Sequence, residues 1–550
     1  MSIMIVLVIS RFIGINKMGR QIETTITDFT GGVTTEARTK DKRKARALKH
    51  FNILSSEDRL IPYRRFEADT FNSALGASVA ANGVRIVKFL TYGTRQAGTM
   101  MFGLGTGTNA GGDVTDDTPR LYYRSVTDIF VHDNWLGDSA TTGIVNENLF
   151  IEFRGIAYAA RANEIIQWTL DVITPFGGSA VALSKSLAFV QIFQGLAHSA
   201  KSILYVPYMT LTGAFIATNV DGAWGGASSD TALTIYTHPS SDTGTGGKID
   251  LCEKGNFIAV AFQPKFVGGN SYVYLWDGNA ALADVSESIS WGVENIELIE
   301  DIDGYLIGIS TQGANSAANF SDSAKVLIKY WDGVRVNPLL ELRCDDRTIQ
   351  ISQKQKVNNR MYFMMSCKIS GAWHEGVWSI GRNKNGQFAL ALEYQLNNDT
   401  QATAVSLKGF KLVGDYMVIS YVDNSTYTLK VTDDAATFSD TSIYESPIFN
   451  GGGAALKKDL LGITVMTEPL DDSPAAQVVV RYKKDNDSSW TTLLTHDTDA
   501  AISASAAGAQ TSPAAFPKDY KEIQFRLEST ASAVITGYSF REEVQDKRPY

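Results

Sequence analysis

Two histidines stand directly beside a carboxylate, at His132-Asp133 and His374-Glu375, and an imidazole with a carboxylate could serve general acid–base catalysis. Adjacent residues on a strand point to opposite faces of the sheet, so neither pair can act as a dyad there. The other histidines stand singly, at His50, His198, His238 and His496. The sequence has no G-x-S-x-G elbow, no H-E-x-x-H and no Walker A motif. We therefore predict surface or loop roles for His132-Asp133 and His374-Glu375, and no catalytic residues.

The three cysteines, Cys252, Cys344 and Cys367, lie far apart, without a C-x-x-C pair or a histidine at ligand spacing. An odd and sparse set of this kind argues against a disulfide framework and against structural zinc. Cys252 and Cys367 fall on or beside expected strands, where a thiol packs like a small apolar side chain. The sequence predicts buried free thiols, no metal and no cofactor.

Aromatic residues could form a platform for sugars. Trp224 stands in the Gly-rich loop Gly222–Gly226, and Tyr122 and Tyr123 could join it, because aromatic faces stack on sugar rings. A sialidase-like propeller would also need an arginine cluster, a Tyr nucleophile and an acid. Thr432–Phe438 resembles the Asp-box turn of such enzymes, but it occurs once and has Phe in place of Trp. A packed loop anchor is the alternative role for Trp224.

A basic segment near the N-terminus is the third candidate site. Its members are Arg38, Lys40, Lys42, Arg43, Lys44, Arg46 and Lys49. The Ala and Leu residues between them permit a short helix. The segment could contact an acidic neighbouring subunit or, weakly, packaged nucleic acid, or it could be a solvated helix face. The formal net charge of the chain is -9, which does not suggest a nucleic-acid-binding protein as a whole.

A strand hairpin between Ile296 and Gly333 is the clearest structural unit. Two apolar runs meet at Asp303-Gly304, and Asp-Gly accepts the positive φ that tight hairpin turns require. An aromatic strand then ends in Trp331-Asp332-Gly333. We interpret this unit as part of a propeller blade.

The same pattern recurs along the chain. Its anchors are Met100, Leu149, Ile203, Phe257, Tyr305, Tyr362 and Tyr416. They are separated by roughly 50 residues each time, which is the period of a kelch-like β-propeller blade. The fold is thus expected to be all-β, with a seven-bladed propeller over residues 71–450. Six blades are the alternative, because the first repeat is irregular between Gly105 and Arg120.

The flanks of the repeats are expected to form two further units. Residues 1–70 are an N-terminal arm, and a strand from residues 50–70 could close the propeller by completing the blade near Tyr416. The glycines 451–453 suggest a boundary. Residues 451–550 then alternate apolar and polar positions in several runs, which predicts an antiparallel β-sandwich.

The first residues, Met1–Ile15, are apolar but too short to span a bilayer and carry Arg11. They also lack the features of a secretory signal. Translation could begin at Met1 or at Met18. We expect no membrane contact.

Both flanks resemble structural proteins of tailed bacteriophages. The segment Asp28–Val33 matches their F-x-G-G opening, and it is followed by a basic Ala-rich segment and by His50–Ile53 and Arg59–Tyr63. The C-terminal runs around Leu461–Val465 and Val478–Tyr482 are also similar.

The resemblance implies a non-enzymatic virion protein, made in the host cytoplasm and built into the tail or the head-to-tail region. Its partners would be other virion proteins and further copies of itself. It would assemble through the propeller loops, the basic arm and the sandwich. A carbohydrate-binding or sialidase-like propeller is the competing hypothesis.

Overall fold

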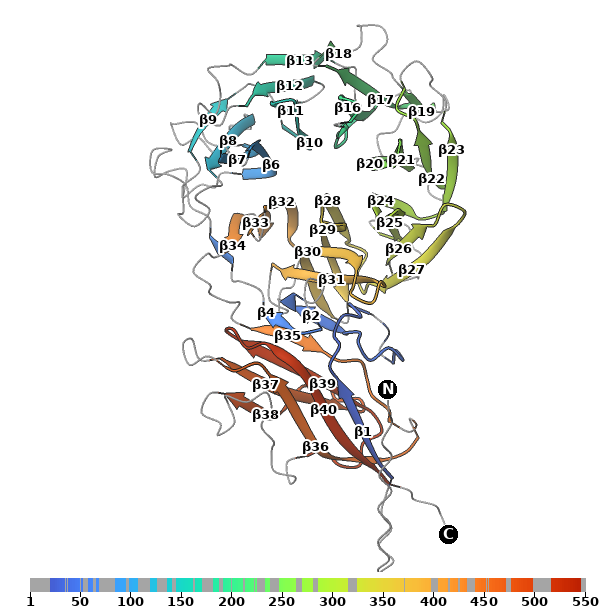
Figure 1. Ribbon diagram of the computed structural model, residues 1–550, viewed down its shortest axis with the longest axis vertical. Coiled ribbons are helices and arrows are strands. Elements are labelled where there is room, and N and C mark those ends of the chain that lie inside the picture. The colour runs from blue at the N-terminus through green and yellow to red at the C-terminus, as the bar shows by residue number, and fades with distance from the viewer. Residues whose placement is uncertain are drawn as a thin grey trace, which may run out of the picture.

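A computed structural model provides the coordinates, and every element in the described part of the chain is a β-strand. The structure describes residues 20–545 except 35, 37, 50, 53–57, 63–65, 69–84, 95–97, 107–118, 126–135, 141–144, 162–163, 171–181, 187–190, 199, 211–212, 222, 225–232, 238–246, 264–269, 280–284, 315–323, 370, 397–403, 414–415, 424–425, 433–440, 452, 454, 471–475 and 498–515. A ring of sheets lies above a two-layered unit (Figure 1).

Seven sheets stand around a common axis, as the repeat pattern predicts, and six of them have four strands. Blade 1 contains β6 (Arg85–Thr94), β7 (Gly98–Thr106), β8 (Pro119–Ser125) and β9 (Leu136–Ala140). Blade 2 contains β10 (Val145–Phe153), β11 (Ile156–Arg161), β12 (Glu164–Thr169) and β13 (Ala182–Ser186). Blade 3 contains β14 (Gln191–Ile192), β15 (Leu196–His198), β16 (Ile203–Met209), β17 (Gly213–Val220), β18 (Ala223–Trp224) and β19 (Leu233–Thr237). Blades 4 and 5 contain β20 (Lys248–Lys254), β21 (Phe257–Gln263), β22 (Ser271–Trp276) and β23 (Glu287–Gly292); β24 (Asn295–Ile302), β25 (Tyr305–Gln312), β26 (Lys325–Trp331) and β27 (Val336–Arg343). Blades 6 and 7 contain β28 (Gln350–Val357), β29 (Arg360–Ile369), β30 (Ala372–Arg382) and β31 (Phe388–Gln395); β32 (Ser406–Val413), β33 (Tyr416–Asp423), β34 (Thr426–Thr432) and β5 (Phe66–Ala68).

The predicted Asp303-Gly304 hairpin is present. Both turn residues have positive φ, 50° and 79°, as a two-residue hairpin turn with the twist of the strands requires. Six of the seven sequence anchors lie on the second strand of a blade, but Leu149 lies on the first strand, β10. That assignment was wrong because β10 and β11 are both apolar, so the periodicity alone could not separate them.

The seventh blade takes its outer strand from the start of the chain. β5 pairs antiparallel with β34, with Ala68 opposite Lys430, so the ring closes without an exposed edge at this blade. This confirms the prediction that a strand from residues 50–70 completes the blade of Tyr416. Two shorter strands of the same region do not take part in the closure. These are β3 (Phe51–Asn52) and β4 (Ile61–Pro62), which pair with each other beneath the ring.

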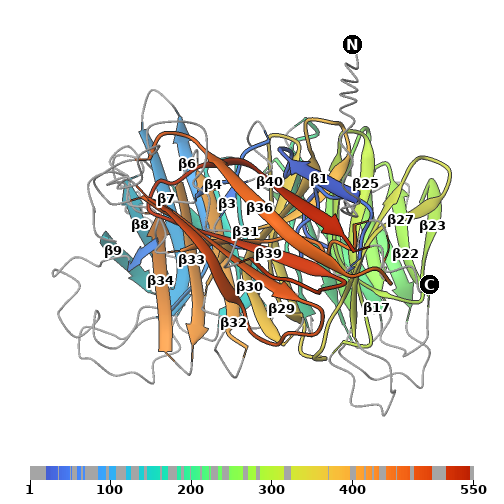
Figure 2. The ribbon, with the colours of Figure 1, turned by 90° about the horizontal axis from the view of Figure 1, so that it is seen from below.

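The lower unit is a β-sandwich of two antiparallel sheets (Figure 2). Its strands in sheet order are β1 (Arg20–Ile26), β40 (Ile535–Val544) and β36 (Lys458–Thr467) in one sheet, and β2 (Ala47–Lys49), β35 (Ser442–Glu445), β39 (Ile523–Thr530), β37 (Gln477–Lys484) and β38 (Thr491–Asp497) in the other. Aromatic side chains fill the space between the sheets, and the Phe525 and Phe540 rings lie 4.8 Å apart. The alternation of buried and half-buried residues along β39 follows the pattern read from the sequence.

The domain boundaries differ from the expected ones. β1 and β2 come from the supposed arm and are strands of the sandwich, and β35 already belongs to the sandwich before residue 450. The glycines near 451 lie inside that unit. A Cβ at Gly451 would come within 2.5 Å of a Glu542 carboxylate oxygen, so close approach of that side chain explains this glycine better than a hinge does.

The described residues of the N-terminal segment 27–46, all but 35 and 37, lie between the two units and form no helix. The Val33 N–H donates to the Leu390 carbonyl of blade 6 at 2.8 Å, and the Arg46 N–H donates to the Glu445 carbonyl of the sandwich at 2.7 Å. Between them, the Ala45 N–H donates to the Gly32 carbonyl at 2.9 Å. These donors are used by tertiary partners, which is why the Ala-rich composition does not produce a helix.

Side chains continue this junction on the hairpin between β30 and β31. The Asn383 amide donates to the Thr30 carbonyl at 2.9 Å, and the Arg43 guanidinium donates to the Gln387 side-chain oxygen at 2.8 Å. A salt bridge joins Lys384 to Asp58. The junction is therefore held by directional bonds as well as by packing.

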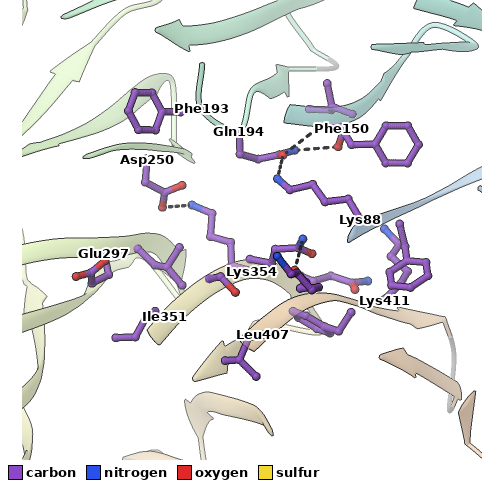
Figure 3. Close-up of a pocket in the computed structure, with 18 of the residues that line it drawn as sticks. Lys88, Phe150, Phe193, Gln194, Asp250, Glu297, Ile351, Lys354, Leu407 and Lys411 are labelled. Carbon is purple, nitrogen blue, oxygen red and sulfur yellow. Dashed lines mark hydrogen bonds and ion pairs between the residues drawn. The ribbon is translucent and has the colours of Figure 1, made fainter. Parts of the chain in front are cut away.

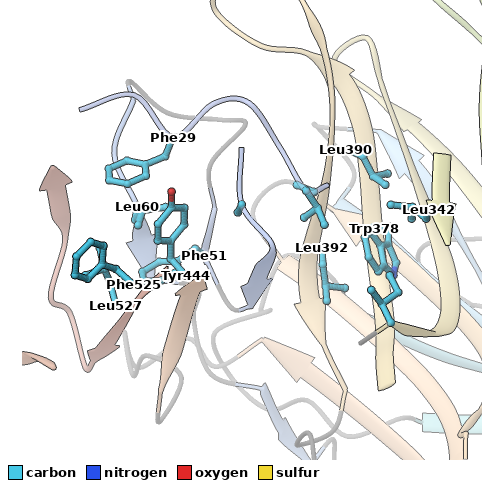
Figure 4. Close-up of a cluster of buried hydrophobic side chains, with 14 of the residues drawn as sticks. Phe29, Phe51, Leu60, Leu342, Trp378, Leu390, Leu392, Tyr444, Phe525 and Leu527 are labelled. Carbon is cyan, nitrogen blue, oxygen red and sulfur yellow. The ribbon is translucent and has the colours of Figure 1, made fainter. Parts of the chain in front are cut away.

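One continuous apolar core runs through the junction (Figure 4). On the sandwich side, the Phe29 ring meets the Tyr444 ring edge-on at 5.1 Å. On the propeller side, Leu390, Leu392 and Trp378 are fully or almost fully buried. Burial of such side chains contributes roughly 1.5–3 kcal/mol each, so separation of the two units would be costly.

Gly32 provides a test of the junction. Its φ is +75°, and an added Cβ would lie 2.6 Å from the Leu390 carbonyl oxygen, whereas Gly255 has a φ of +60° with open space around it. We expect Gly32→Ala to lower the free energy of unfolding by about 3 kcal/mol and Gly255→Ala by about 1 kcal/mol. Denaturant titration measures both, and equal losses would contradict the proposed contact.

Candidate functional site

The innermost strands of the seven blades surround a cavity of about 500 Å³ (Figure 3). Every blade contributes lining residues, and many of them are charged. The charged residues are Lys88, Glu152, Lys248, Asp250, Glu297, Lys354, Lys408 and Lys411. A concave site with a few fixed polar groups is where ligands usually bind, so the cavity is the candidate functional site.

Lys354 on β28 is the central cation of the cavity. Its Nζ donates to Asp250 Oδ2 at 2.6 Å, to the Leu251 carbonyl at 2.8 Å and to the Ile299 carbonyl at 2.5 Å. The same Asp250 oxygen accepts the Ile299 N–H at 2.7 Å. One buried ion pair thus joins blade 6 to blades 4 and 5.

The electrostatics of this cluster follow from burial and charge. Burial alone would lower the pKa of Lys354, but the Asp250 and Glu300 carboxylates outweigh it, so the pKa is raised. Burial raises the pKa of the Glu300 carboxyl in spite of nearby Lys354 and Lys356. Burial also raises the pKa of the Cys252 thiol. The cluster therefore holds Lys354 as a cation.

Glutamine side chains link other blades in place of a strand ladder. The Gln194 amide bonds both backbone groups of Phe150, accepting the N–H at 3.3 Å and donating to the carbonyl at 3.1 Å. Gln355 does the same for Leu412 of blade 7, at 2.9 and 2.8 Å. The Lys88 ammonium adds a bond of 2.7 Å to the Gln194 oxygen. The cavity wall is thus a fixed frame of hydrogen bonds.

Lys411 on β32 differs from these residues. It lines the cavity where blade 7 meets blade 1, on the same side as Lys88 (Figure 3). Among the described residues, no hydrogen-bond acceptor and no carboxylate pairs with its ammonium group. Burial lowers the pKa of Lys411, and no neighbouring charge opposes that shift.

The carboxylates of the cavity hold other groups in place. Glu297 pairs with Lys248 and accepts the Thr311 hydroxyl at 2.7 Å, and Glu152 accepts the Gly155 N–H at 2.7 Å. Asp250 holds Lys354, as described above. The geometry of these residues supports recognition of charge more than transfer of protons.

The basic segment proposed as a partner contact is largely tied into the fold. Arg38 forms a two-point ion pair with Glu522 of the sandwich, at 2.6 and 2.7 Å. Arg43 bonds Asp41 and Gln387. Burial lowers the pKa of the half-buried Arg46. These arginines therefore serve the junction.

The lysines of that segment are more accessible. Lys40 and Lys42 are exposed and Lys44 is half-buried. Lys49 lies on β2, and its side chain lies outside what the structure describes. Of the described side chains among the seven basic residues, those of Arg38, Lys40 and Lys42 are exposed and those of Arg43, Lys44 and Arg46 are half-buried.

The proposed glycan platform is not assembled by the described residues. Trp224 is half-buried and meets the Tyr158 ring edge-on at 6.0 Å, against the core between blades 2 and 3. This is the packed-anchor role. Tyr122 and Tyr123 lie on β8, but their side chains are not among those described.

The remaining candidates are the two His–carboxylate pairs and the cysteines. The predicted surface or loop role of His374-Glu375 was wrong, because both residues are buried on strand β30. His374 lies near Trp378, whereas Glu375 accepts the Ser366 hydroxyl at 2.9 Å and the Val405 N–H at 2.8 Å. His132 lies outside the described residues. Cys252 and Cys367 are free and buried, as predicted, and so is Cys344.

The described residues show neither a metal-binding cluster nor a membrane-spanning helix. No group of three or more His, Cys, Asp or Glu side chains among them could hold a metal ion. They include no helix that is long and apolar enough to cross a membrane.

Sequence reasoning missed the cavity lysines. These lysines, Lys354, Lys88 and Lys411, lie on innermost strands. Apolar residues are frequent among the other residues of those strands taken together. A charged residue at such a position of a repeat was the available signal, because a buried charge needs a partner.

Lys354 and Lys411 allow a matched test. Lys354→Met leaves the Asp250 carboxylate buried without its cation, so we expect a loss of about 3 kcal/mol in the free energy of unfolding. Lys411→Met removes a cation that has no partner among the described residues, so we expect no loss or a gain of up to about 1 kcal/mol. Denaturant titration at pH 7 distinguishes the two. Equal losses would contradict this description of the cavity.

The lowered pKa of Lys411 sets the sign of a pH effect. Between that lowered pKa and the ordinary value near 10.5, the unfolded chain binds more protons at this residue than the folded chain does. Lys411 therefore costs stability at neutral pH and less as the pH rises through its folded pKa. The advantage of Lys411→Met should shrink accordingly toward alkaline pH.

No protein-family model matches the chain, and no curated protein sequence matches it. Among solved structures, the Dos1 propeller is similar over 70% of this chain and 95% of its own, with 10% identity and a TM-score of 0.38. The β-propeller domain of the Trilobed protease from Pyrococcus furiosus is similar over 64% and 95%, with 10% identity and a TM-score of 0.35. An exo-β-1,3-galactanase from Phanerochaete chrysosporium is similar over 87% and 99%, with 8% identity and a TM-score of 0.27. The order and closure of the seven sheets make this chain a β-propeller protein.

Proposed function

We propose that the protein is a non-enzymatic structural component of a tailed-phage virion, located in the tail or the head-to-tail region. The observation that carries this proposal is the junction. The N-terminal segment supplies two strands of the sandwich and then the closing strand of the propeller, so one segment is built into both units. A two-unit block with two separate docking surfaces suits a repeated assembly.

The residues of the phage resemblance lie at this junction. Phe29, Gly32 and Val33 belong to its first phrase, and Phe51 and Leu60 belong to the next two. Phe29, Phe51 and Leu60 are almost completely buried in the core that spans the two units. The resemblance therefore concerns residues that build the two-unit block, and it supports a shared architecture of that kind.

The partners would be other virion proteins and copies of the chain. Lys40 and Lys42 are exposed beside the junction and would suit an acidic surface of a neighbour. The outer face of the sandwich carries an ion-pair group in which Arg481 bonds Glu528 at 2.9 Å, and Arg526 lies over the Trp490 ring at 5.7 Å. Aromatic and arginine side chains together are common at the centres of protein interfaces.

Purified particles provide the direct test. We expect mass spectrometry to find the protein at a fixed copy number per virion, and a particle reconstruction to locate it in the tail or at the neck. Absence from washed particles would contradict the proposal. So would clear turnover of sialosides or polysaccharides by the purified protein, which would support the competing glycan hypothesis.

Charge reversal tests the partner surface. We expect Lys40→Glu with Lys42→Glu to reduce incorporation into particles at least several-fold, because a rim charge governs association more than folding. The unfolding midpoint should stay within the error of the wild type. Lys518→Glu, at an exposed lysine of the sandwich, is the matched control. Equal incorporation of all three proteins would exclude Lys40 and Lys42 from the contact.

A further inference from the structure

We propose that the central cavity of the propeller binds a small ligand carrying carboxylate or phosphate groups, with Lys411 as its main cation. This binding activity is separate from the assembly role and does not depend on it. Three observations carry it: the volume of the cavity, the excess of lysines in its wall, and the position of Lys411 on that wall without a partner among the described residues.

The cavity has the size and the wall of a ligand site. Its volume of about 500 Å³ lies within the range of small-molecule pockets. The Lys354 cluster and the Gln194 and Gln355 bonds fix the surrounding strands to one another. A ligand would therefore enter a preorganised site and lose little affinity to reordering of the protein.

The wall carries more positive than negative charge. Five lysines and three carboxylates line the cavity, so the described charges leave an excess that an anion would balance. Lys354 and Lys248 are committed to Asp250 and Glu297 through their ion pairs. Glu152 is turned to the Gly155 N–H of its own hairpin. No carboxylate of the described wall is thus directed at Lys411.

Lys411 is the residue whose ammonium group a bound anion would pair with. It is half-buried, lines the cavity beside Phe410 and has no acceptor among the described residues, although partial withdrawal of a charge from water without a partner is costly. Its lowered pKa reports the same cost. A carboxylate or phosphate oxygen would offer the charge-assisted hydrogen bond that the protein itself does not provide.

Carboxylates and phosphates share this chemistry, and two probes distinguish them. Calorimetric titration of the full chain with citrate and with inorganic phosphate, at constant ionic strength set by sodium chloride, measures each affinity. We expect at least one of the two to bind with 1:1 stoichiometry. The anion that binds more tightly identifies the class of ligand.

The variants assign the binding to the cavity. We expect Lys411→Met to weaken binding at least about tenfold, because it removes a charge-assisted hydrogen bond, and Lys411→Arg to retain part of it. Lys518→Met, at an exposed lysine of the sandwich, should bind like the wild type. Since Lys411→Met is expected to fold at least as well as the wild type, its thermal unfolding also checks that lost binding is not lost structure.

Two results would overturn the proposal. One is the absence of binding of either anion to the wild type at millimolar concentration. The other is an equal affinity of the wild type and Lys411→Met for the anion that binds. Either result leaves the virion proposal untouched, because incorporation into particles is measured independently.

Discussion

The hydrogen bond from the Val33 N–H to the Leu390 carbonyl marks the contact on which the architecture depends. At this point the start of the chain meets the outer strand of blade 6, and Gly32 makes the approach possible because no side chain intervenes. The segment before the contact is a sandwich strand, and the segment after it leads to the closing strand of the propeller. The first part of the chain therefore organises both units.

In the cavity, as at the junction, hydrogen bonds join segments that lie far apart in the sequence. Where inner strands of neighbouring blades diverge, backbone ladders cannot form, and side-chain amides and one ion pair take their place. Such bonds are costly to leave unmade in a buried site. These side-chain bonds explain why polar residues line the cavity, although the blades pack against one another through apolar faces. Lys411 is the exception, and it is the reason to infer a ligand.

Much of the fold could be predicted because it depends on local chemistry. Asp303-Gly304 specifies its turn by backbone conformation, and a strand period repeated seven times indicates blades without knowledge of their contacts. The role of the basic segment could not be predicted, because Arg38 pairs with Glu522, 484 residues later. The composition of that segment permits a helix, but its backbone groups form hydrogen bonds with distant residues instead. The cavity lysines could not be predicted either, because strands from seven distant parts of the sequence bring them together.

Hydrogen exchange of the N-terminal segment tests the central claim most directly, namely that residues 27–46 are a structural part of the junction. The claim predicts that the hydrogen-bonded amides of the segment, those of Val33, Thr34, Ala45 and Arg46, exchange as slowly as those of β31 and β39. The bonds to Leu390 and Glu445 require this, because exchange would need the junction to open. Exchange of the segment within seconds, with both flanking units protected, would show a free arm and contradict the account.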